Sequence, residues 1–404
     1  MTAGGAELKF PSNFFWGCAT SAHQIEGGLL NDWTEWEKSP GRLADLKEKQ
    51  EDPLDFISGS AANSFVENNA DISCLKDLGA NAYRFSVDWS RLEPQEGRFS
   101  EEALQYYKEF VKKLRAHRIE PFVTLWHWPL PLWLRDKGGW ENRQTITYFR
   151  RFAGRIASYL DEEVNFWVTL NEPLVYASQS YLAGEWPPNK KSYLSLWRVI
   201  NNLAAGHRAA YRSLKGINGA NQVGIAKNNI YFEAARGAGV NKFLKRAADW
   251  WWNERFLNKI KRQQDFIGLN YYFHNLVDYG FGRPFDYDKR SDLAWGLYPE
   301  GIYHVLRGLQ RYDKPVYITE NGLADRGDQH RAWYITEILK NVHKAIGCGV
   351  PVKGYFHWSL IDNFEWAQGF RPRFGLYEIN YQTFERRPRP SASFYADICR
   401  YNRI

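Results

Sequence analysis

The chain has 404 residues, of which 44% are hydrophobic and 25% are charged, a composition typical of a folded globular protein. Its formal charge of +7 is a mild basic bias that does not indicate a nucleic-acid partner. No apolar run approaches the roughly 18–20 residues that cross a bilayer, and residues 1–9 lack the apolar core of a secretory signal. We therefore expect neither a nucleic-acid nor a membrane partner.

Eight short apolar runs predict strands that are buried on both faces, as in a parallel sheet. The stretches between them have helical periodicity; Leu104, Tyr107, Val111 and Leu114, for example, share one face. Eight strand–helix repeats without a flexible linker predict an α/β fold, a single (β/α)₈ TIM barrel over residues 1–404. The predicted strands are 14–19, 82–86, 122–125, 166–170, 223–226, 266–269, 316–319 and 352–356.

Polar residues gather at the carboxyl ends of six of these strands, where a TIM barrel holds its active site. Packing alone does not explain so regular a pattern, so we expect a functional site at this end of the barrel. The polar residues, in chain order, are Arg84, His127, Asn171, Glu172, Asn270, Tyr272, Glu320, Asn321 and His357.

Two of these residues are carboxylates, Glu172 in TLNEP (169–173) and Glu320 in YITENG (317–322). One such glutamate could simply cap a helix or pair with a surface lysine. Two that face one cavity suit glycoside hydrolysis, which needs a neutral acid and an anion. Pro173 predicts an extended backbone at Glu172, and Gly322 predicts a sharp turn after Glu320.

The cysteines Cys18, Cys74, Cys348 and Cys399 lie far apart and form no CxxC pair. They are typical of free thiols in a reducing compartment, so we expect a cytoplasmic protein. His127 and His357 stand alone at their strand ends, without the convergent ligands that a metal-dependent barrel hydrolase needs. We expect no metal and no cofactor.

Six stretches, including the two that contain Glu172 and Glu320, carry a resemblance to a known family. They are FFWGCATSAHQIEGG (14–28), YRFSVDWSRL (83–92), TLNEP, GLNYY (268–272), YITENG, and YFHWSLIDNFEWAQGF (355–370) followed by RFGLYEI (373–379). In these motifs, which occur in family order and span nearly the whole chain, the protein resembles the family 1 glycoside hydrolases, the β-glucosidase and β-galactosidase family.

The resemblance implies that Glu172 is the general acid/base and Glu320 the nucleophile of a retaining β-glycosidase. The two carboxyl groups would then lie about 5–5.5 Å apart. Arg84 and Tyr272 would keep Glu320 anionic, with Asn270 as a further supporting residue. The charge of Glu320 would in turn raise the pKa of Glu172.

The substrate implied is a small β-glycoside with a terminal glucose or galactose. Trp358 matches the platform on which the sugar stacks, and Glu365, as a carboxylate, could accept hydrogen bonds from two hydroxyls. His127 and the tryptophans could instead be core residues. The residues assigned to substrate binding are Gln24, His127, Trp128, Asn171, Trp358, Glu365, Trp366 and Phe374.

The chain departs from the family pattern between the fifth and sixth strands, at about 228–264. This segment is shorter than the family pattern by several tens of residues, which predicts a wider and less rigid entrance for the aglycone. Trp250, Trp251 and Trp252 could either plug this region or form an exposed binding patch.

Two alternatives remain. A 6-phospho-β-glycosidase is disfavoured because an anionic Glu365 would repel a phosphate. A non-catalytic carbohydrate-binding barrel is disfavoured because both Glu172 and Glu320 are present. The preferred glycone and the oligomeric state are left open.

Overall fold

The computed structural model describes residues 7–160, 162–237, 239–279 and 285–404. Residues 1–6 of the N-terminal segment and position 238 of the segment 228–264, for which the sequence raised expectations, lie outside the described residues.

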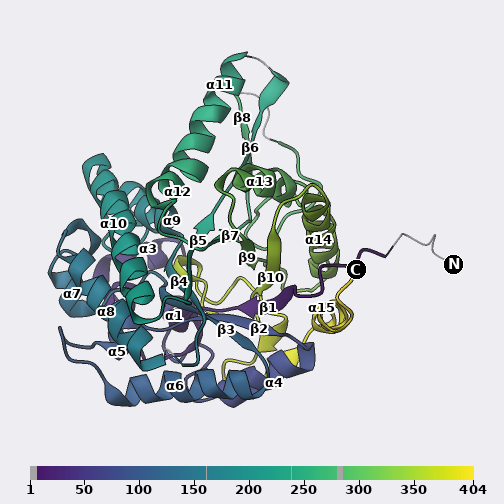
Figure 1. The fold of residues 1–404 in the computed structure, drawn as a ribbon. Helices are drawn as coiled ribbons and strands as arrows, with labels where there is room; N and C mark the ends of the chain where they lie inside the picture. The colour runs from purple at the N-terminus through teal and green to yellow at the C-terminus, as the bar shows by residue number, and fades with distance from the viewer. Residues whose placement is uncertain (1–6, 161, 238, 280–284) are drawn as a thin grey trace.

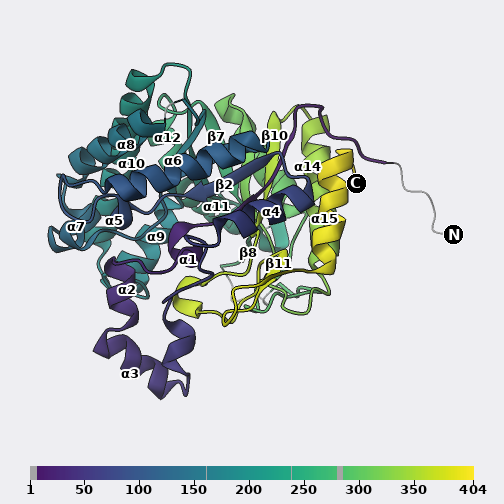
Figure 2. The ribbon, with the colours of Figure 1, turned by 90° about the horizontal axis from the view of Figure 1, so that it is seen from below.

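Eight parallel strands close into a barrel and follow one another around it in chain order (Figure 1). Helices surround the strands (Figures 1 and 2), so the predicted (β/α)₈ barrel is confirmed. Each predicted strand is found, with ends that differ by at most a few residues. The barrel strands are β1 (Phe15–Ala19), β2 (Ala82–Ser86), β3 (Glu120–Trp126), β4 (Phe166–Asn171), β5 (Gln222–Asn228), β7 (Phe266–Asn270), β9 (Val316–Asn321) and β10 (Val352–Trp358).

Apolar side chains bury the strands on both faces, as continuous apolar runs require. Phe122, Phe266 and Phe356 fill the inside of the barrel together with Phe166, whose ring stacks on that of Phe122 at 4.2 Å. A second core lies between the strands and the surrounding helices. This double core holds the strand ends, and the residues that follow them, in place.

The helices between the strands pack their apolar faces inward. In α6 (Glu101–Ala116), Leu104, Tyr107, Val111 and Leu114 are all buried, as their spacing predicts, and the Ser100 side chain caps the helix. The other α-helices are α1 (Ala22–Ile25), α2 (Asp32–Glu37), α3 (Pro40–Glu48), α4 (Asn68–Leu78), α5 (Trp89–Leu92), α7 (Leu132–Asp136), α8 (Thr145–Leu160), α9 (Pro173–Ser178), α10 (Tyr193–Ile217), α13 (Gly301–Leu309), α14 (Arg331–Gly347) and α15 (Pro390–Tyr401).

The segment between β5 and β7 is folded rather than open. It forms β6 (Tyr231–Ala234), α11 (Gly239–Ala248), the π-helical turn η5 (Asp249–Glu254) and α12 (Arg255–Ile260). β6 pairs with β8 (His274–Val277), and with α11 this pair projects from the barrel at the top of Figure 1.

Two further features complete the fold. A small sheet joins β11 (Tyr377–Ile379) to β12 (Arg386–Pro388), and α2 and α3 stand out from the barrel (Figure 2). Within the part of the chain that the structure describes, no helix is long and apolar enough to span a membrane.

The strand register sets the polar strand ends side by side. Asn171 pairs with Ala226, Asn228 with Asn270, and Asn270 with Glu320. Four neighbouring strands therefore present polar side chains at the carboxyl end of the barrel.

Candidate active site

A cavity of about 500 Å³ opens at the carboxyl ends of the strands. Four of the predicted site residues, Gln24, Arg84, Asn171 and Asn270, are not on its surface. They are buried and form hydrogen bonds to residues that line the cavity. The predicted residues that line the cavity are His127, Trp128, Glu172, Tyr272, Glu320, Trp358, Glu365, Trp366 and Phe374.

Glu320, at the end of β9, lies against a buried arginine. Arg84 Nη1 donates to Oε1 of Glu320 at 2.5 Å, and the Tyr272 hydroxyl donates to Oε2 at 3.1 Å. Arg84 is itself held in place, because its Nε donates to Thr124 and its Nη2 to Asn171. Burial raises the pKa of the Glu320 carboxyl, and the charge of Arg84 is the largest of the effects that lower it.

Glu172 has a different neighbour, the amide of Asn270, which donates to its Oε1 at 2.8 Å. Burial raises the pKa of Glu172 to about 8, and the negative charge of Glu320 adds to this effect. Hydrogen bonds from Asn270 and Asn228 lower the pKa, but by less. The predicted rise in the pKa of Glu172 is therefore found, with burial as the larger cause.

The expectation of an extended backbone at Glu172 is wrong. Its φ of 44° and ψ of 59° are left-handed, not extended. The chain passes here from β4 directly into α9, so the Glu172 N–H donates to Ala226 while its carbonyl accepts from Tyr176. Pro173 instead occupies the first turn of α9, where a missing N–H costs nothing.

Gly322 is needed for a reason other than the expected turn. A Cβ atom at this position would lie 1.6 Å from the carbonyl oxygen of Trp358. Close approach of the β9 and β10 strand ends, rather than an unusual φ, excludes a side chain after Glu320.

Glu365 and Gln24 meet at the rim of the cavity. Gln24 Nε2 donates to Glu365 Oε2 at 3.2 Å and to Asn363 at 2.9 Å. Burial raises the pKa of Glu365 to about 8, and the charge of Glu320 is the next cause. The expectation of an anionic Glu365 at neutral pH is therefore wrong for the free protein, because three carboxyl groups share one poorly solvated space.

His127 is more than a core histidine, since it lines the cavity and its Nε2 pairs with the Asn171 amide at 2.9 Å. Burial and the charge of Arg84 lower its pKa, so the ring is neutral. Its ring stacks on those of Trp358 and Trp366 at 6.0 and 5.9 Å. These rings give the cavity a flat aromatic wall, which suits the CH face of a sugar.

The three consecutive tryptophans have different environments, which answers the question left open by the sequence. Trp252 lines the cavity and donates to Asn228 at 3.2 Å. Trp251 packs against Arg255 and Trp197, whereas Trp250 is 51% exposed. One ring therefore belongs to the site, one is half-buried against α10 and α12, and one faces solvent.

Sequence reasoning missed the residues that loops bring to the outer part of the cavity. Asn228 has a weaker signal than Asn270, because it lies two residues beyond the fifth apolar run, with Lys227 between, whereas Asn270 directly follows the sixth. The sequence leaves Trp252 open as a plug or part of a binding patch, and Ala367 and Gln368 lie in the motif at 355–370, but none of these three is predicted as a site residue. The missed lining residues are Val175, Ser178, Gln179, Glu185, Trp186, Asn228, Ile230, Trp252, Phe273, Asn275, Leu293, Trp295, Ala367 and Gln368.

The family model for glycosyl hydrolase family 1 matches residues 6–237 and 238–404. The chain belongs to this family. It is 33% identical to β-glucosidase A of Thermotoga maritima, over 98% of each chain. It is 30% identical to a β-galactosidase of Pyrococcus woesei, again over 98% of each. The solved structure of a β-glycosidase from Pyrococcus horikoshii superposes with a TM-score of 0.91 at 38% identity, covering 98% of this chain and 96% of that one.

This family 1 glycosyl hydrolase is a β-glycosidase. Its alignment with the Thermotoga maritima enzyme runs over 448 positions, more than the 404 residues of this chain. That relative therefore has residues with no counterpart here.

Proposed function

We propose that this β-glycosidase hydrolyses terminal β-D-glucosides or β-D-galactosides with retention of configuration, with Glu320 as nucleophile and Glu172 as acid/base. The contact that supports these roles is that between Arg84 and Glu320. It stabilises the anion at Glu320, whereas the side chains that donate to Glu172 are the neutral amides of Asn270 and Asn228. The first proton to leave the pair is then the one on Glu320.

In the first step, a Glu320 oxygen forms a bond to the anomeric carbon as the bond from that carbon to the leaving oxygen breaks. Glu172 gives its proton to the leaving oxygen. The required separation of the two carboxyl groups is about 5–5.5 Å, and we propose this distance here. Tyr272 and Arg84 then hold the Glu320 ester in position.

In the second step, Glu172 takes a proton from water while the water oxygen attacks the anomeric carbon. The Glu320 ester bond breaks, and its electron pair returns to the carboxylate. Esterification of Glu320 removes its negative charge, so the pKa of Glu172 falls and the residue can act as a base.

Trapping with a 2-deoxy-2-fluoroglycosyl fluoride tests these roles, because a good leaving group allows the first step and the fluorine slows the second. We expect one equivalent of sugar on the peptide that contains Glu320, found by mass spectrometry. NMR of the first-formed product should show the β-anomer. A label elsewhere, or an α-product, would overturn the assignment.

We propose that the substrates are unphosphorylated. Among the described residues, the cavity lining contains the carboxylic side chains Glu172, Glu185, Glu320 and Glu365, and neither lysine nor arginine. A phosphate would therefore lack a cationic partner, whether or not Glu365 is ionised. Nitrophenyl β-glucoside, β-galactoside and their 6-phosphates, assayed side by side, test it; faster hydrolysis of a 6-phosphate would contradict it.

We further propose a cytoplasmic location and a wide aglycone entrance. All four cysteines are free thiols, and Cys348 is exposed, which suits a reducing compartment. The Thermotoga maritima relative has residues with no counterpart here, as a shortened segment at 228–264 would require. Fractionation of the source cells, and a comparison of aglycones of increasing size, test these two points.

A further inference from the structure

A buried lysine lies at the end of β5, next to the candidate acid/base. Lys227 is 1% exposed. Its ammonium donates to the Asn228 carbonyl and to Asn229 Oδ1, and lies 5.5 Å from the ring centre of Trp252. It forms no ion pair with any carboxylate of the described residues. A buried ammonium without a counter-ion is costly, so its position calls for an explanation.

The position of Lys227 follows from the pairing of β4 with β5. The Glu172 N–H donates to the carbonyl of Ala226 at 2.8 Å, and Ala226 directly precedes Lys227. Burial lowers the pKa of Lys227 to about 7, and the charge of Glu172 is the effect that raises it. Lys227 in turn is among the groups that lower the pKa of Glu172.

Charges on the other elements packed against β5 do not replace Glu172. On α9, burial raises the pKa of Tyr176, and on α10 burial lowers the pKa of His207 to about 4, so both are neutral at neutral pH. Further along α10, Tyr211 and Lys215 bond to Asp265 at the opposite end of the strand.

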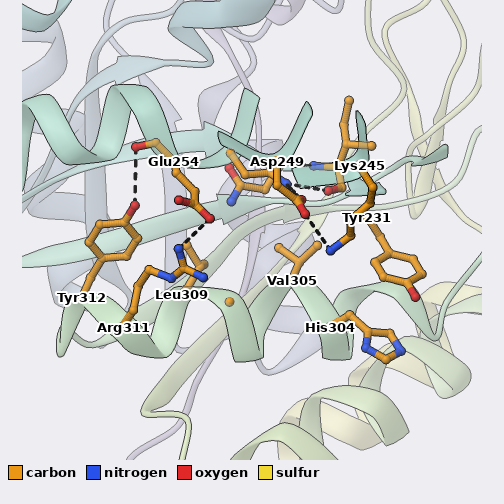
Figure 3. Close-up of a pocket in the computed structure, with 13 residues that line it drawn as sticks. Tyr231, Lys245, Asp249, Glu254, His304, Val305, Leu309, Arg311 and Tyr312 are labelled. Atoms are coloured by element: carbon orange, nitrogen blue, oxygen red, sulfur yellow. Dashed lines mark hydrogen bonds and ion pairs between the residues drawn. The ribbon is translucent and has the colours of Figure 1, made fainter. Parts of the chain in front are cut away.

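The outer side of the 228–231 segment faces a second cavity, of about 270 Å³, which Asn229 also lines (Figure 3). The charged side chains that line this second cavity form ion pairs with one another, Lys245 with Asp249 at 2.6 Å and Arg311 with Glu254 at 2.5 Å. They therefore leave Lys227 without a partner on that side.

The groups that face Glu172 across the active-site cavity are also accounted for. Glu320 is paired with Arg84, and the Tyr272 hydroxyl is uncharged because burial raises its pKa. Burial likewise leaves His127 neutral and Glu365 protonated. Esterification of Glu320 also removes the ion partner of Arg84, so Arg84 and Lys227 are then the two buried cations near Glu172. Lys227 already lowers the pKa of Glu172 before that step, and its effect on Glu172 can be tested without disturbing the nucleophile.

We propose that Lys227 is a positioning residue for the second half of the reaction, in which its ammonium stabilises the ionised form of Glu172. The proposal rests on the acid/base role of Glu172. After the first step Glu172 has lost its proton in a poorly solvated site, where a nearby positive charge counts more than it would in water. Lys227 stays outside the cavity and transfers no proton itself.

Reactivation of the trapped 2-fluoroglycosyl-enzyme measures the second step alone. We would follow the return of activity between pH 4.5 and 8.5, after removal of excess reagent, in the wild type, Lys227→Met and Lys227→Gln. The wild-type rate should rise with pH as Glu172 ionises. In both variants this rise should move to higher pH by about 0.5–1 unit, which lowers the rate at pH 5.5 about 3–10-fold and leaves the plateau unchanged.

Three comparisons make the result decisive. Lys227→Gln keeps a hydrogen-bond donor without the charge, so it serves if Lys227→Met does not fold. Lys215→Met is the matched control, because Lys215 also donates to a backbone carbonyl but lies at the other end of β5; its profile should match the wild type. In Glu172→Gln the pH-dependent rise should vanish.

The possible failures are distinguishable. If the reactivation rate still rises with pH in Glu172→Gln, the acid/base assignment of Glu172 is overturned. A rise that vanishes there but is unmoved in both Lys227 variants would overturn only the role of Lys227. A lower plateau without a shift would show that Lys227 merely supports the fold, and would also overturn the proposal.

Discussion

The guanidinium of Arg84 lies 2.5 Å from a carboxylate oxygen of Glu320, whereas Glu172, in the same cavity, accepts a hydrogen bond from the neutral amide of Asn270. At Glu320 a permanent cation opposes the effect of burial, whereas at Glu172 burial and the charge of Glu320 both favour the neutral form. On this asymmetry we base the proposed tasks of the two glutamates, and the predictions below depend on it.

Glu320→Gln should lose at least about 1,000-fold in kcat, because the amide cannot form the glycosyl ester. Binding of a sugar-like inhibitor should change little, since the shape of the cavity is kept. Calorimetry and steady-state kinetics measure the two effects. Glu378→Gln, an exposed change on β11, is the control; equal turnover in both variants would rule out Glu320 as nucleophile.

Glu172→Ala should lower kcat/KM about 100–10,000-fold for alkyl β-glycosides but far less for dinitrophenyl β-glycosides, which need little proton assistance. Equal losses on both substrates would contradict the role of Glu172 as acid.

The raised pKa of Glu172 predicts the alkaline limb of the pH profile of kcat/KM. The pKa of Glu172 is raised to about 8 and the acid acts when protonated, so kcat/KM for alkyl glycosides should fall as the pH rises through about 8. For dinitrophenyl glycosides this limb should be much weaker. An alkaline limb of the same size for both substrate types would exclude Glu172 as its source.

Glu365→Gln should stabilise the protein more at pH 8.5 than at pH 5. The pKa of Glu365 is raised in the folded state, to about 8, so the unfolded chain gives up this proton first and stability is lost as the pH rises toward 8. Glutamine does not titrate. Denaturant unfolding should show a difference between the two pH values of about 1–2 kcal/mol, reduced because the side chain is partly exposed. No difference would mean that Glu365 ionises normally.

Trp252→Ala should raise KM for nitrophenyl glycosides about 10-fold by removing an aromatic wall of the cavity. Methyl glycosides, whose aglycone is too small to reach the wall, should be affected less. Trp250→Ala is the matched control, because this neighbour is exposed. If both variants behave alike, Trp252 makes no aglycone contact.

Hydrogen exchange should divide the segment 228–264 into two parts. Within α11 the buried residue is Asn241, whereas α12 buries Phe256, Leu257 and Ile260. Amides of α11 should therefore exchange well before those of α12 and α6. Uniform, high protection across the segment would contradict the expected loosening of the entrance.

The barrel and its two glutamates could be predicted because their signals are local. Continuous apolar runs predict strands buried on both faces, and a polar residue directly after a strand must lie at the rim. The rule does not select Asn228, because Lys227 directly follows the fifth predicted run and lies outside the cavity. Trp252 and Trp295 carry no such signal, because turns outside the barrel bring them to the cavity.

The sequence by itself determined which residues lie at the strand ends, since alternation and strand length depend on neighbours along the chain. Only the tertiary structure decided their protonation and their partners. The raised pKa of Glu365 and the lowered pKa of Lys227 result from burial in the packed barrel, and the left-handed backbone of Glu172 results from the direct passage of β4 into α9. Desolvation and charge depend on the distance through space, and the packed barrel sets that distance.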